Sequence, residues 1–202
     1  MVQYCVRILN DHWTQRAKRD GYPARSVYKL QEMEERFHIL RGARKVLDLG
    51  AAPGSWTLYI LRTFHPTPHV VAVDLSPLAI PPHEKLAFFQ GDFTDPDLRD
   101  TLASHGPFDV ILSDAAPVTT GVRTVDTARS EALVETVLEL VPALLKTGGT
   151  CVVKVFQGSD IQQIRHRFGQ IFGKTRTFKP KACRSESFEL YVIGEEKRDG
   201  FN

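Results

Sequence analysis

The sequence has few cysteines, no long apolar run and no repeated unit, and each absence argues against a class of protein. Its 202 residues include three cysteines, Cys5, Cys151 and Cys183. Their wide spacing and odd number argue against a disulfide framework and against a cysteine-based zinc site. No apolar run approaches the roughly 18 to 20 residues that a membrane span needs, and the first residues show no secretory signal. We therefore expect a cytoplasmic protein that does not bind a membrane.

The chain also lacks low-complexity segments and any Pro/Gly/Ser-rich stretch long enough to link two domains. Hydrophobic residues make up 42% of it and charged residues 25%, which is typical of a globular protein with one sizeable core. We expect a single domain over residues 1–202, with its core in 45–195 and a basic N-terminal segment, 1–40, packed on that core. The sequence does not determine the oligomeric state, and a monomer is the default expectation.

The net charge of +2 conceals an uneven distribution of charged residues. Residues 1–30 carry six Lys/Arg against two acids, residues 161–184 carry seven Lys/Arg and no acid, and residues 31–160 carry 11 basic and 17 acidic residues. Most basic runs are simply solvated faces. Two such runs around an acidic middle can also form a phosphate-binding surface, and the nearby Tyr28 and Phe178 could stack on bases.

From about Lys45 onward, short apolar segments alternate with helical stretches. The predicted strands are rich in Val, Leu or Ile on both faces, as in a buried parallel sheet, and span 45–49, 69–74, 85–89, 108–113 and 150–156. The longest predicted helix runs from about Thr124 to Leu145, and Gly148-Gly149 is expected to end it. This alternation predicts an α/β fold with a doubly wound, mostly parallel Rossmann-like sheet and helices on both faces.

Three further elements complete the predicted fold at the C-terminal end. They are a helix at about 159–172, a short strand at about 174–178 and a final antiparallel strand, SFELYVIG, at 187–194. Before the sheet, RSVYKLQEMEERF (25–37) has the pattern of an amphipathic helix whose apolar stripe comprises Val27, Leu30, Met33 and Phe37. We expect this helix to lie against the sheet.

A glycine-containing turn follows the first predicted strand, in LDLGAAPGSW (47–56). Gly50 and Gly54 allow a tight turn and a close approach of the backbone to a ligand. The turn has neither the GxGxxG spacing of dinucleotide enzymes nor the lysine of a phosphate-binding loop. Asp74 ends the second strand, where it can accept hydrogen bonds from ribose hydroxyls, and Asp92 follows the third strand, where it can accept from an adenine amino group. The series fits a nucleoside without phosphates, most commonly S-adenosylmethionine (SAM).

The predicted strand in CVVKVFQG (151–158) contains a lysine, Lys154, among five apolar residues. Lysine is among the residues least often buried, because its ammonium group loses hydration there. A lysine near the end of a strand can also extend its side chain to solvent. Lys154 is nevertheless the least expected residue of the sheet, and we consider it a candidate functional residue.

Six segments occur in an order and spacing that resemble one family. LDLGAAPGSW, VVAVDLSP, FQGDFTD, ILSDAAP, GGTCVVKVFQG and ESFELYVIG are similar to the motifs of the FtsJ/RrmJ family of RNA ribose 2′-O-methyltransferases. The resemblance covers about residues 10–195. It implies a SAM-dependent methyltransferase that releases S-adenosylhomocysteine, requires no metal and acts on RNA. Within the family, the small single-domain form implies a uridine of large-subunit ribosomal RNA, free or in a ribosomal particle, whereas transfer RNA stays open as an alternative.

The resemblance also implies the site residues. The family's catalytic Lys-Asp-Lys-Glu tetrad corresponds to Lys29 in RSVYKL, Asp114 in ILSDAAP, Lys154 in VVKVFQG and Glu189 in FELYV. The positions that correspond to the family's cofactor-binding motifs are Gly50, Ala51, Pro53, Gly54, Trp56, Asp74, Leu75, Asp92, Phe93 and Asp114.

The chemistry of ribose methylation gives each member of this tetrad a role. The donor's leaving group is already activated, so the enzyme must align the reactants and help to remove the proton of a weakly acidic hydroxyl. A free lysine, with a pKa near 10.4, is protonated at neutral pH; burial and a neighbouring Lys29 favour the neutral amine of Lys154, whereas the two carboxylates oppose this. We expect Lys154 to accept the proton or orient the oxygen, Asp114 to fix Lys154 and the methyl donor, and Lys29 and Glu189 to position the ribose.

Two positions depart from the family pattern. Ser55 stands where the family often has glycine, and Val118 follows SDAAP where the family often has asparagine. Val118 cannot form a hydrogen bond through its side chain, so the resemblance leaves the contacts to the acceptor nucleotide, and with them the exact RNA target, open.

Other functions are less consistent with the residues. Amino-group methyltransferases of this fold usually have a Pro-Pro-aromatic stretch where this chain reads SDAAPV, and base-carbon methylation needs a cysteine near the ligand, whereas Cys151 begins its strand and is expected in the core. A small-molecule hydroxyl acceptor stays open, although the basic segments favour RNA. A SAM-fold RNA-binding or ribosome assembly factor without activity also stays open, but would not need the complete tetrad.

Overall fold

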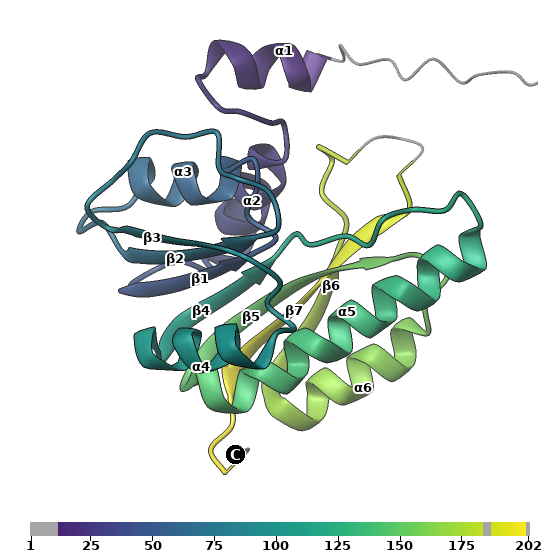
Figure 1. Cartoon of the computed structure of the whole chain (residues 1–202). Helices are drawn as coiled ribbons and strands as arrows, with labels where there is room; N and C mark the ends of the chain where they lie inside the picture. The colour runs from purple at the N-terminus through teal and green to yellow at the C-terminus, as the bar shows by residue number, and fades with distance from the viewer. Residues whose placement is uncertain (1–11, 184–186, 201–202) are drawn as a thin grey trace, which may run out of the picture.

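The computed structural model describes residues 12–183 and 187–200, and Cys5, Arg7 and Arg184 of the basic segments lie outside these ranges. A seven-stranded sheet with the order β3-β2-β1-β4-β5-β7-β6 forms the centre of the molecule (Figure 1). The strands are β1 Lys45–Leu49, β2 His69–Asp74, β3 Leu86–Gln90, β4 Phe108–Ser113, β5 Leu145–Phe156, β6 Phe172–Phe178 and β7 Glu189–Lys197. β1 to β5 pair in parallel, and β7 runs antiparallel to both of its neighbours.

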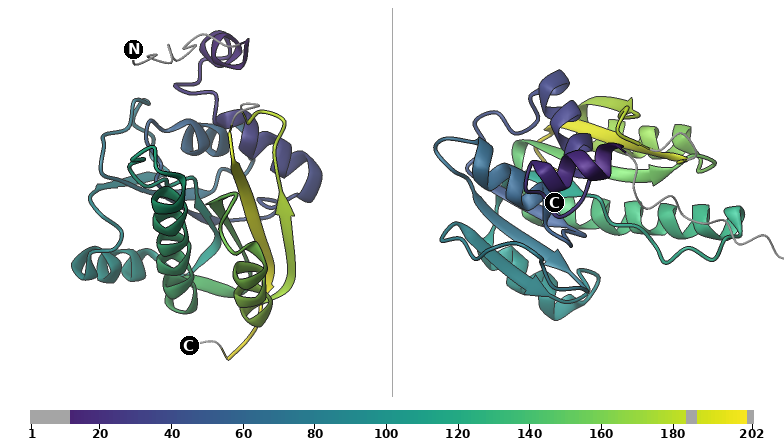
Figure 2. Two further views of the ribbon diagram at one scale, coloured as in Figure 1. Left: turned by 90° about the vertical axis from the view of Figure 1, so that its right-hand side faces the viewer. Right: turned by 90° about the horizontal axis from the view of Figure 1, so that it is seen from above.

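Helices cover both faces of the sheet, and this arrangement confirms the predicted fold class. The helices are α1 His12–Arg19, α2 Val27–Phe37, α3 Ser55–Thr63, α4 Pro96–His105, α5 Arg123–Leu144 and α6 Ile161–Ile171. α2 and α3 lie on one face and α4, α5 and α6 on the other, while α1 lies beyond α2 (Figures 1 and 2). Within the described ranges, no helix is long and apolar enough to cross a membrane.

The core consists of two layers because successive side chains of a strand point to opposite faces. Leu112 of β4 and Val152 of β5 pack toward α2 and α3, whereas their neighbours Ile111 and Val153 pack toward α5 and α6. All four are buried. Residues two positions apart on one strand therefore share a face of the sheet. This rule also determines which face the polar residues of the site described below occupy.

The predicted boundaries of most elements agree with the structure to within two residues, but the start of β5 does not. The strand begins at Leu145, directly after α5, and Gly148-Gly149 lie inside it instead of ending a helix. The backbone of Leu145 pairs with Phe108 at the start of β4, so the ladder forms before the glycines are reached. Pairing between strands, which the local sequence does not reveal, overrode the glycine signal.

The amphipathic helix predicted at 25–37 is present as α2. Val27, Leu30 and Met33 are completely buried beneath it, and Phe37 at its end is half-buried. The side chains of this stripe pack with Trp56 and Tyr59 of α3 on the same face of the sheet. The apolar stripe thus fixes α2 against the strands β4, β5 and β7.

One carboxyl group, that of Asp48 near the end of β1, lies in this core and is fully buried. Thr57 of α3 donates to its Oδ2 at 2.7 Å, whereas its Oδ1 has no hydrogen-bond partner within the described part of the chain. Burial raises the pKa of Asp48 to about 7, with the carboxylates of Asp114 and Asp74 acting in the same direction. An unsatisfied buried carboxylate is costly, so ionisation of Asp48 destabilises the folded state.

We predict that Asp48→Asn stabilises the protein relative to the wild type as the pH rises. Because the pKa of Asp48 is higher in the folded state than in the unfolded state, the wild type loses stability between about pH 4 and pH 7. The variant cannot ionise and avoids this loss, so its relative free energy of unfolding should increase by about 1–4 kcal/mol across that window. Urea unfolding at several pH values measures the difference.

Asp109→Asn serves as the control with the opposite sign. Burial raises the pKa of Asp109, but the ammonium of Lys146 and the backbone amides of Arg44 and Lys45 outweigh it, so the pKa lies below its usual value. This carboxylate stabilises the fold above the unfolded pKa, and the variant should lose stability at neutral pH but not in acid. A pH-independent difference for Asp48→Asn would contradict the assignment.

Candidate active site

The four predicted acidic and glycine positions lie at one edge of the sheet. Gly50 follows β1, Asp74 ends β2, Asp92 follows β3 and Asp114 follows β4. Because these strands are parallel and adjacent in the order β3-β2-β1-β4, their carboxyl ends share that edge. The structure therefore brings together the series that the sequence predicted for a nucleoside.

The turn after β1 is held tightly between the segments that follow β2 and β4. Gly50 has φ +74° and donates from its backbone amide to the carbonyl of Val73 at 2.9 Å. A Cβ at this position would lie 2.6 Å from Cα of Ala115. The amide of Ala51 also donates to Val73, at 3.1 Å. Glycine is needed at position 50 both for its backbone conformation and for the close approach of the chain beyond Asp114.

The second half of the turn leads into α3. Gly54, at φ +108°, donates to the carbonyl of Ala51 at 2.7 Å, and a Cβ there would lie 2.8 Å from the side chain of Ile80. The carbonyl of Pro53 accepts from the amide of Ala79 at 2.9 Å. The turn is thus closed against the loop after β2, which carries part of the predicted cofactor site.

Two of the carboxylates at this edge, those of Asp74 and Asp92, remain accessible. Asp74 accepts from the amide of Ala52 at 2.9 Å and from that of Ser76 at 2.8 Å, and it is half-buried. Asp92 is exposed and accepts from the amide of Thr94 through Oδ1. Leu75 is 68% exposed. Carboxylate oxygens can accept more than one hydrogen bond, so both acids can also bind ligand hydroxyl or amino groups.

Two other predicted cofactor residues direct their side chains into the protein. Trp56 is buried, donates from Nε1 to the carbonyl of Ser26 at 2.8 Å, and packs on Tyr191 with ring centroids 5.8 Å apart. Phe93 is buried in the core on the α4 and α5 face. The indole of Trp56 thus connects α3 to the segment before α2.

The predicted catalytic residues converge because of strand parity. Asp114 is two residues beyond Leu112, Lys154 is two residues beyond Val152, and Glu189 precedes Tyr191 by two on β7. All three positions therefore face α2, on β5 and β7 and just beyond the end of the adjacent β4. Lys29 of α2 covers the same place from above.

The four polar groups form one connected cluster. Nζ of Lys154 lies 3.1 Å from Oδ1 of Asp114 and also donates to the Asp114 carbonyl. Nζ of Lys29 lies 2.7 Å from Oε1 of Glu189 and 4.0 Å from Oδ1 of Asp114. The side chains of both lysines are only 8% exposed. Two ammonium and two carboxylate groups balance each other in a largely buried site, as such charges require.

A fifth member of the cluster, Tyr191, was not anticipated. It is completely buried, and its hydroxyl donates to Oδ1 of Asp114 at 2.6 Å. Tyr191 is paired with Lys154 across β7 and β5, and Nζ of Lys29 lies 5.9 Å from its ring centroid. In the sequence it resembles an ordinary core aromatic residue, although its spacing of two from Glu189 places it on the same face.

The charges of the cluster stabilise one another against burial. Burial raises the pKa of Asp114, but the ammonium groups of Lys154 and Lys29 outweigh this, and the pKa lies below its usual value. Burial lowers the pKa of Lys29, but the carboxylates of Asp114 and Glu189 outweigh it, and the pKa lies above its usual value. Burial and the Asp114 carboxylate raise the pKa of Tyr191 well above 10, so the phenol stays a donor.

The segment after β6 closes the cluster on one side. Glu32 of α2 accepts from the backbone amides of Lys181 and Ala182, each at 2.8 Å. The next residue, Cys183, is buried, and burial together with the Glu189 carboxylate raises the pKa of its thiol to about 12. Cys183 is thus a protonated neighbour of Glu189. Cys151 is buried in the core, as expected.

The family departure at Ser55 has a structural explanation. Its buried hydroxyl accepts from the backbone amide of Ala24 at 2.8 Å and donates to the carbonyl of the same residue at 3.0 Å. The residue therefore ties the segment before α2 to the start of α3. Val118, the other departure, is 85% exposed, and its carbonyl accepts from Arg129.

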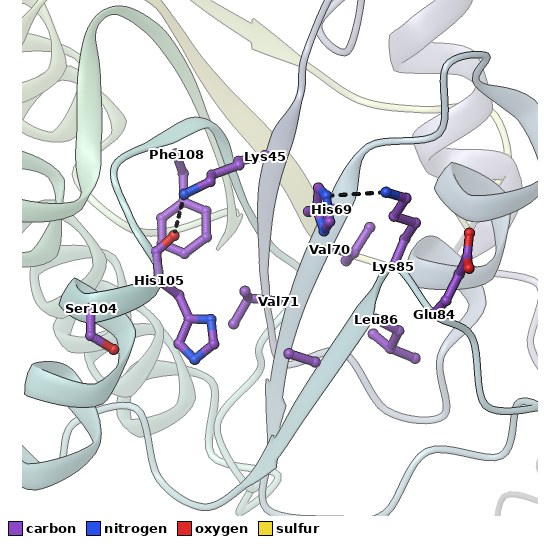
Figure 3. Close-up of a pocket in the computed structure, with 11 residues that line it drawn as sticks. Lys45, His69, Val70, Val71, Glu84, Lys85, Leu86, Ser104, His105 and Phe108 are labelled. Atoms are coloured by element: carbon purple, nitrogen blue, oxygen red, sulfur yellow. Dashed lines mark hydrogen bonds between the residues drawn. The ribbon is translucent and has the colours of Figure 1, made fainter.

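A separate pocket of about 370 Å³ lies at the opposite edge of the sheet (Figure 3). Lys45, His69, Lys85 and His105 contribute to its lining, at the amino ends of β1 and β2 and near the end of α4. Nζ of Lys45 donates to the carbonyl of His105 at 2.9 Å and so caps α4. This pocket is distant from the carboxyl ends of the strands and takes no part in the candidate site.

In the described ranges, no group of three or more His, Cys, Asp or Glu side chains is placed to hold a metal ion.

We predict that Gly50→Ala destabilises the protein far more than Gly42→Ala, a substitution at a glycine with nearly the same φ. Gly42→Ala is the control, because Gly42 has φ +76° but no atom within 4 Å of an added Cβ. The control should lose only the conformational cost, about 1–2 kcal/mol. Gly50→Ala should lose about 2–5 kcal/mol and weaken binding of SAM, since the chain at Ala115 must move. Thermal unfolding and titration calorimetry measure both, and equal losses in the two variants would refute the prediction.

Comparisons with known proteins find related chains over most of the length of this one. A family model described as FtsJ-like methyltransferase matches residues 22–197. A protein named ribosomal RNA large subunit methyltransferase E from Treponema denticola is 51% identical over 185 residues, covering 91% of this chain and 93% of that protein. The protein of the same name from Syntrophobacter fumaroxidans is 44% identical over 198 residues, covering 98% of this chain and 99% of that protein.

Solved structures share the fold. A ribosomal RNA methyltransferase from Plasmodium falciparum superposes with a TM-score of 0.76 at 26% identity, over 87% of this chain and 98% of that chain. Human methyltransferase-like protein 13 in complex with SAH superposes with a TM-score of 0.57 at 15% identity, over 86% of this chain and 81% of that chain, and is a likeness of fold alone. With the match over most of its length and these relatives, the chain belongs to the FtsJ-like methyltransferase family.

Proposed function

We propose that the protein transfers a methyl group from SAM to a ribose 2′-hydroxyl of large-subunit ribosomal RNA. The observation that carries this proposal is the cluster of Lys29, Asp114, Lys154 and Glu189, placed where the turn after β1 approaches the end of β4. Such a cluster can handle the proton of a weakly acidic hydroxyl. The names of the relatives in Treponema denticola and Syntrophobacter fumaroxidans support ribosomal RNA of the large subunit as the substrate.

The residues at the sheet edge fit SAM. The half-buried Asp74 and the exposed Asp92 present carboxylates that suit ribose hydroxyls and an adenine amino group. A phosphate-binding lysine is not needed, because SAM carries no phosphate. When bound, SAM supplies a methyl group attached to a sulfonium sulfur. The thioether that remains after transfer leaves without needing a proton. The protein must therefore orient the acceptor oxygen and manage its proton.

Lys154 is the residue that accepts this proton. Its Nζ is held by both the carboxylate and the carbonyl of Asp114, so its direction is fixed. General-base assistance of this kind contributes about 10²- to 10⁴-fold to a rate.

Lys29 and Glu189 complete the site by positioning the ribose. Their ion pair, at 2.7 Å, lies next to Asp114 on the side of α2. Lys29 can donate to ribose oxygens and Glu189 can accept from a hydroxyl, which supplies both kinds of hydrogen bond that a sugar requires. The carboxylates of Glu189 and Asp114 also hold the pKa of Lys29 above its usual value, so Lys29 stays charged.

We predict that Lys154→Ala lowers the single-turnover rate of methyl transfer by about 10²- to 10⁴-fold, because the base is lost. SAM should still bind, because the turn after β1, Asp74 and Asp92 are unchanged in this variant. Purified ribosomal RNA with labelled SAM provides the substrate.

Lys197→Ala is the matched control. Lys197 is also buried in the sheet, but it donates to the carbonyls of Pro142 and Leu145 at the opposite edge. This variant should lose stability while its folded molecules keep the wild-type rate. Normal turnover in Lys154→Ala would remove Lys154 from the mechanism.

The position of the methyl group follows from alkaline hydrolysis of the labelled RNA. A 2′-O-methyl group protects the adjacent phosphodiester, so the label should appear in dinucleotides. Labelled mononucleotides would indicate base methylation, and no incorporation into RNA from cells that lack the protein would favour an inactive assembly factor. Mapping the nucleotide in that RNA distinguishes ribosomal from transfer RNA.

A further inference from the structure

A groove of about 520 Å³ lies beside the candidate site, on the outer side of α2. It is formed by α1, α2 and the segment that follows β6, which are adjacent in both views of Figure 2. Its lining is Trp13, Arg16, Tyr28, Gln31, Glu32, Glu35, Arg36, Phe178, Lys179 and Lys181. We call this the α1–α2–β6 groove.

The charge of the groove favours an anionic ligand. Four cationic side chains face two carboxylates, and one of these, Glu32, is already occupied by the backbone amides of Lys181 and Ala182. In the part of the chain that the structure describes, the side chains of Arg36 and Lys181 make no ion pair. These two cations can therefore bind phosphates without first breaking an internal salt bridge.

Aromatic rings lie among these cations. The Phe178 ring packs edge-to-face on Phe37, with centroids 5.2 Å apart, and the Arg36 guanidinium lies 5.3 Å from the Phe178 centroid. Trp13 is half-buried and packs on Tyr28 at 5.1 Å. Tyr28 itself, which the sequence suggested as a stacking residue, is 2% exposed and donates from its hydroxyl to Asp20. Trp13 and Phe178, rather than Tyr28, are thus available to a base.

The groove and the proton-handling cluster share two elements. Tyr28 lines the groove and the next residue, Lys29, belongs to the cluster, while the segment from Phe178 to Cys183 leads from one to the other. From Lys29 to Arg36 along α2 is about 10 Å at 1.5 Å per residue. A strand whose ribose lies at Lys154 can therefore continue into the groove.

We propose that the α1–α2–β6 groove binds unpaired RNA next to the methylated nucleotide, with one or two bases stacked on Phe178 and Trp13 and phosphates at Arg36 and Lys181. This inference rests on the proposed function for its RNA substrate. The bases must be unpaired, because in a duplex their faces are covered by neighbouring bases. Proteins that bind single-stranded nucleic acids combine cationic side chains with aromatic rings on which the bases stack.

The test compares Phe178→Leu and Trp13→Leu with the wild-type protein. Leucine preserves an apolar side chain against Phe37 or Tyr28 but removes the flat ring. Fluorescence anisotropy with a short labelled oligouridylate should show binding about 10-fold weaker in either variant. Binding of a short RNA duplex should not change. Arg165→Gln, on the exposed surface of α6 across the sheet, is the control and should bind as the wild type.

The phosphate contacts have a separate readout. Arg36→Gln and Lys181→Gln should each reduce the slope of log affinity against log salt by about 0.7. In methyl transfer to ribosomal RNA, all four variants should raise KM for RNA while kcat stays within about twofold of the wild type. Circular dichroism checks that the variants remain folded.

The outcomes separate this inference from the proposed function. If the variants bind oligouridylate as tightly as the wild type, the groove is not an RNA site, whether or not the wild type methylates RNA. If polyglutamate displaces the oligouridylate equally well at equal charge, the groove recognises anions or acidic proteins and the stacking proposal is wrong. If the wild type methylates no RNA but the leucine variants still lose binding, the proposed function fails and the groove assignment stands.

Discussion

The candidate site depends on one oxygen atom, Oδ1 of Asp114. It accepts a hydrogen bond from Tyr191, lies 3.1 Å from the ammonium of Lys154, and is the nearest carboxylate charge to Lys29 after Glu189. Removing the Asp114 carboxylate would leave two buried ammonium groups with a single carboxylate. The fold would lose stability, because one buried charge would then have no partner. The same oxygen fixes the direction of the Lys154 side chain. The charge balance of the cluster and the alignment of the proposed base therefore both depend on this one atom. Tyr191 strengthens this arrangement without adding charge.

The position of Asp114 is in turn set by backbone packing around the turn after β1. Gly50 touches the chain at Ala115 so closely that no side chain fits between them. The proposed cofactor loop and the proposed catalytic carboxylate therefore cannot move independently. α2 is fixed to this unit by two hydrogen-bonded connections, from Ser55 to Ala24 and from Trp56 to Ser26. These contacts bring Lys29, far away in the sequence, to within reach of Asp114.

Much of this could be predicted from residues that act through local geometry. The predicted strands placed Asp114 and Lys154 at or near strand ends, and the apolar stripe of α2 predicted its packing on the sheet. The grouping of Lys29 and Glu189 with them came from a family resemblance, because a lysine on a helix flank and a glutamate on a terminal strand carry no local signal. The buried Asp48, the role of Tyr191 and the start of β5 were missed. Each depends on contacts between elements distant in the sequence, where pairing or burial overrides the preference of a single residue.

The most direct test of Lys154 as the proton acceptor is the pH dependence of single-turnover methyl transfer by the wild-type protein with saturating RNA and SAM. A general base must lose its own proton before it can accept one from the substrate. With Lys154 as the base, the rate should increase about tenfold per pH unit and then level off once Lys154 has lost its proton. A rate that stays constant between about pH 6 and pH 9 would contradict the role of Lys154 as the proton acceptor.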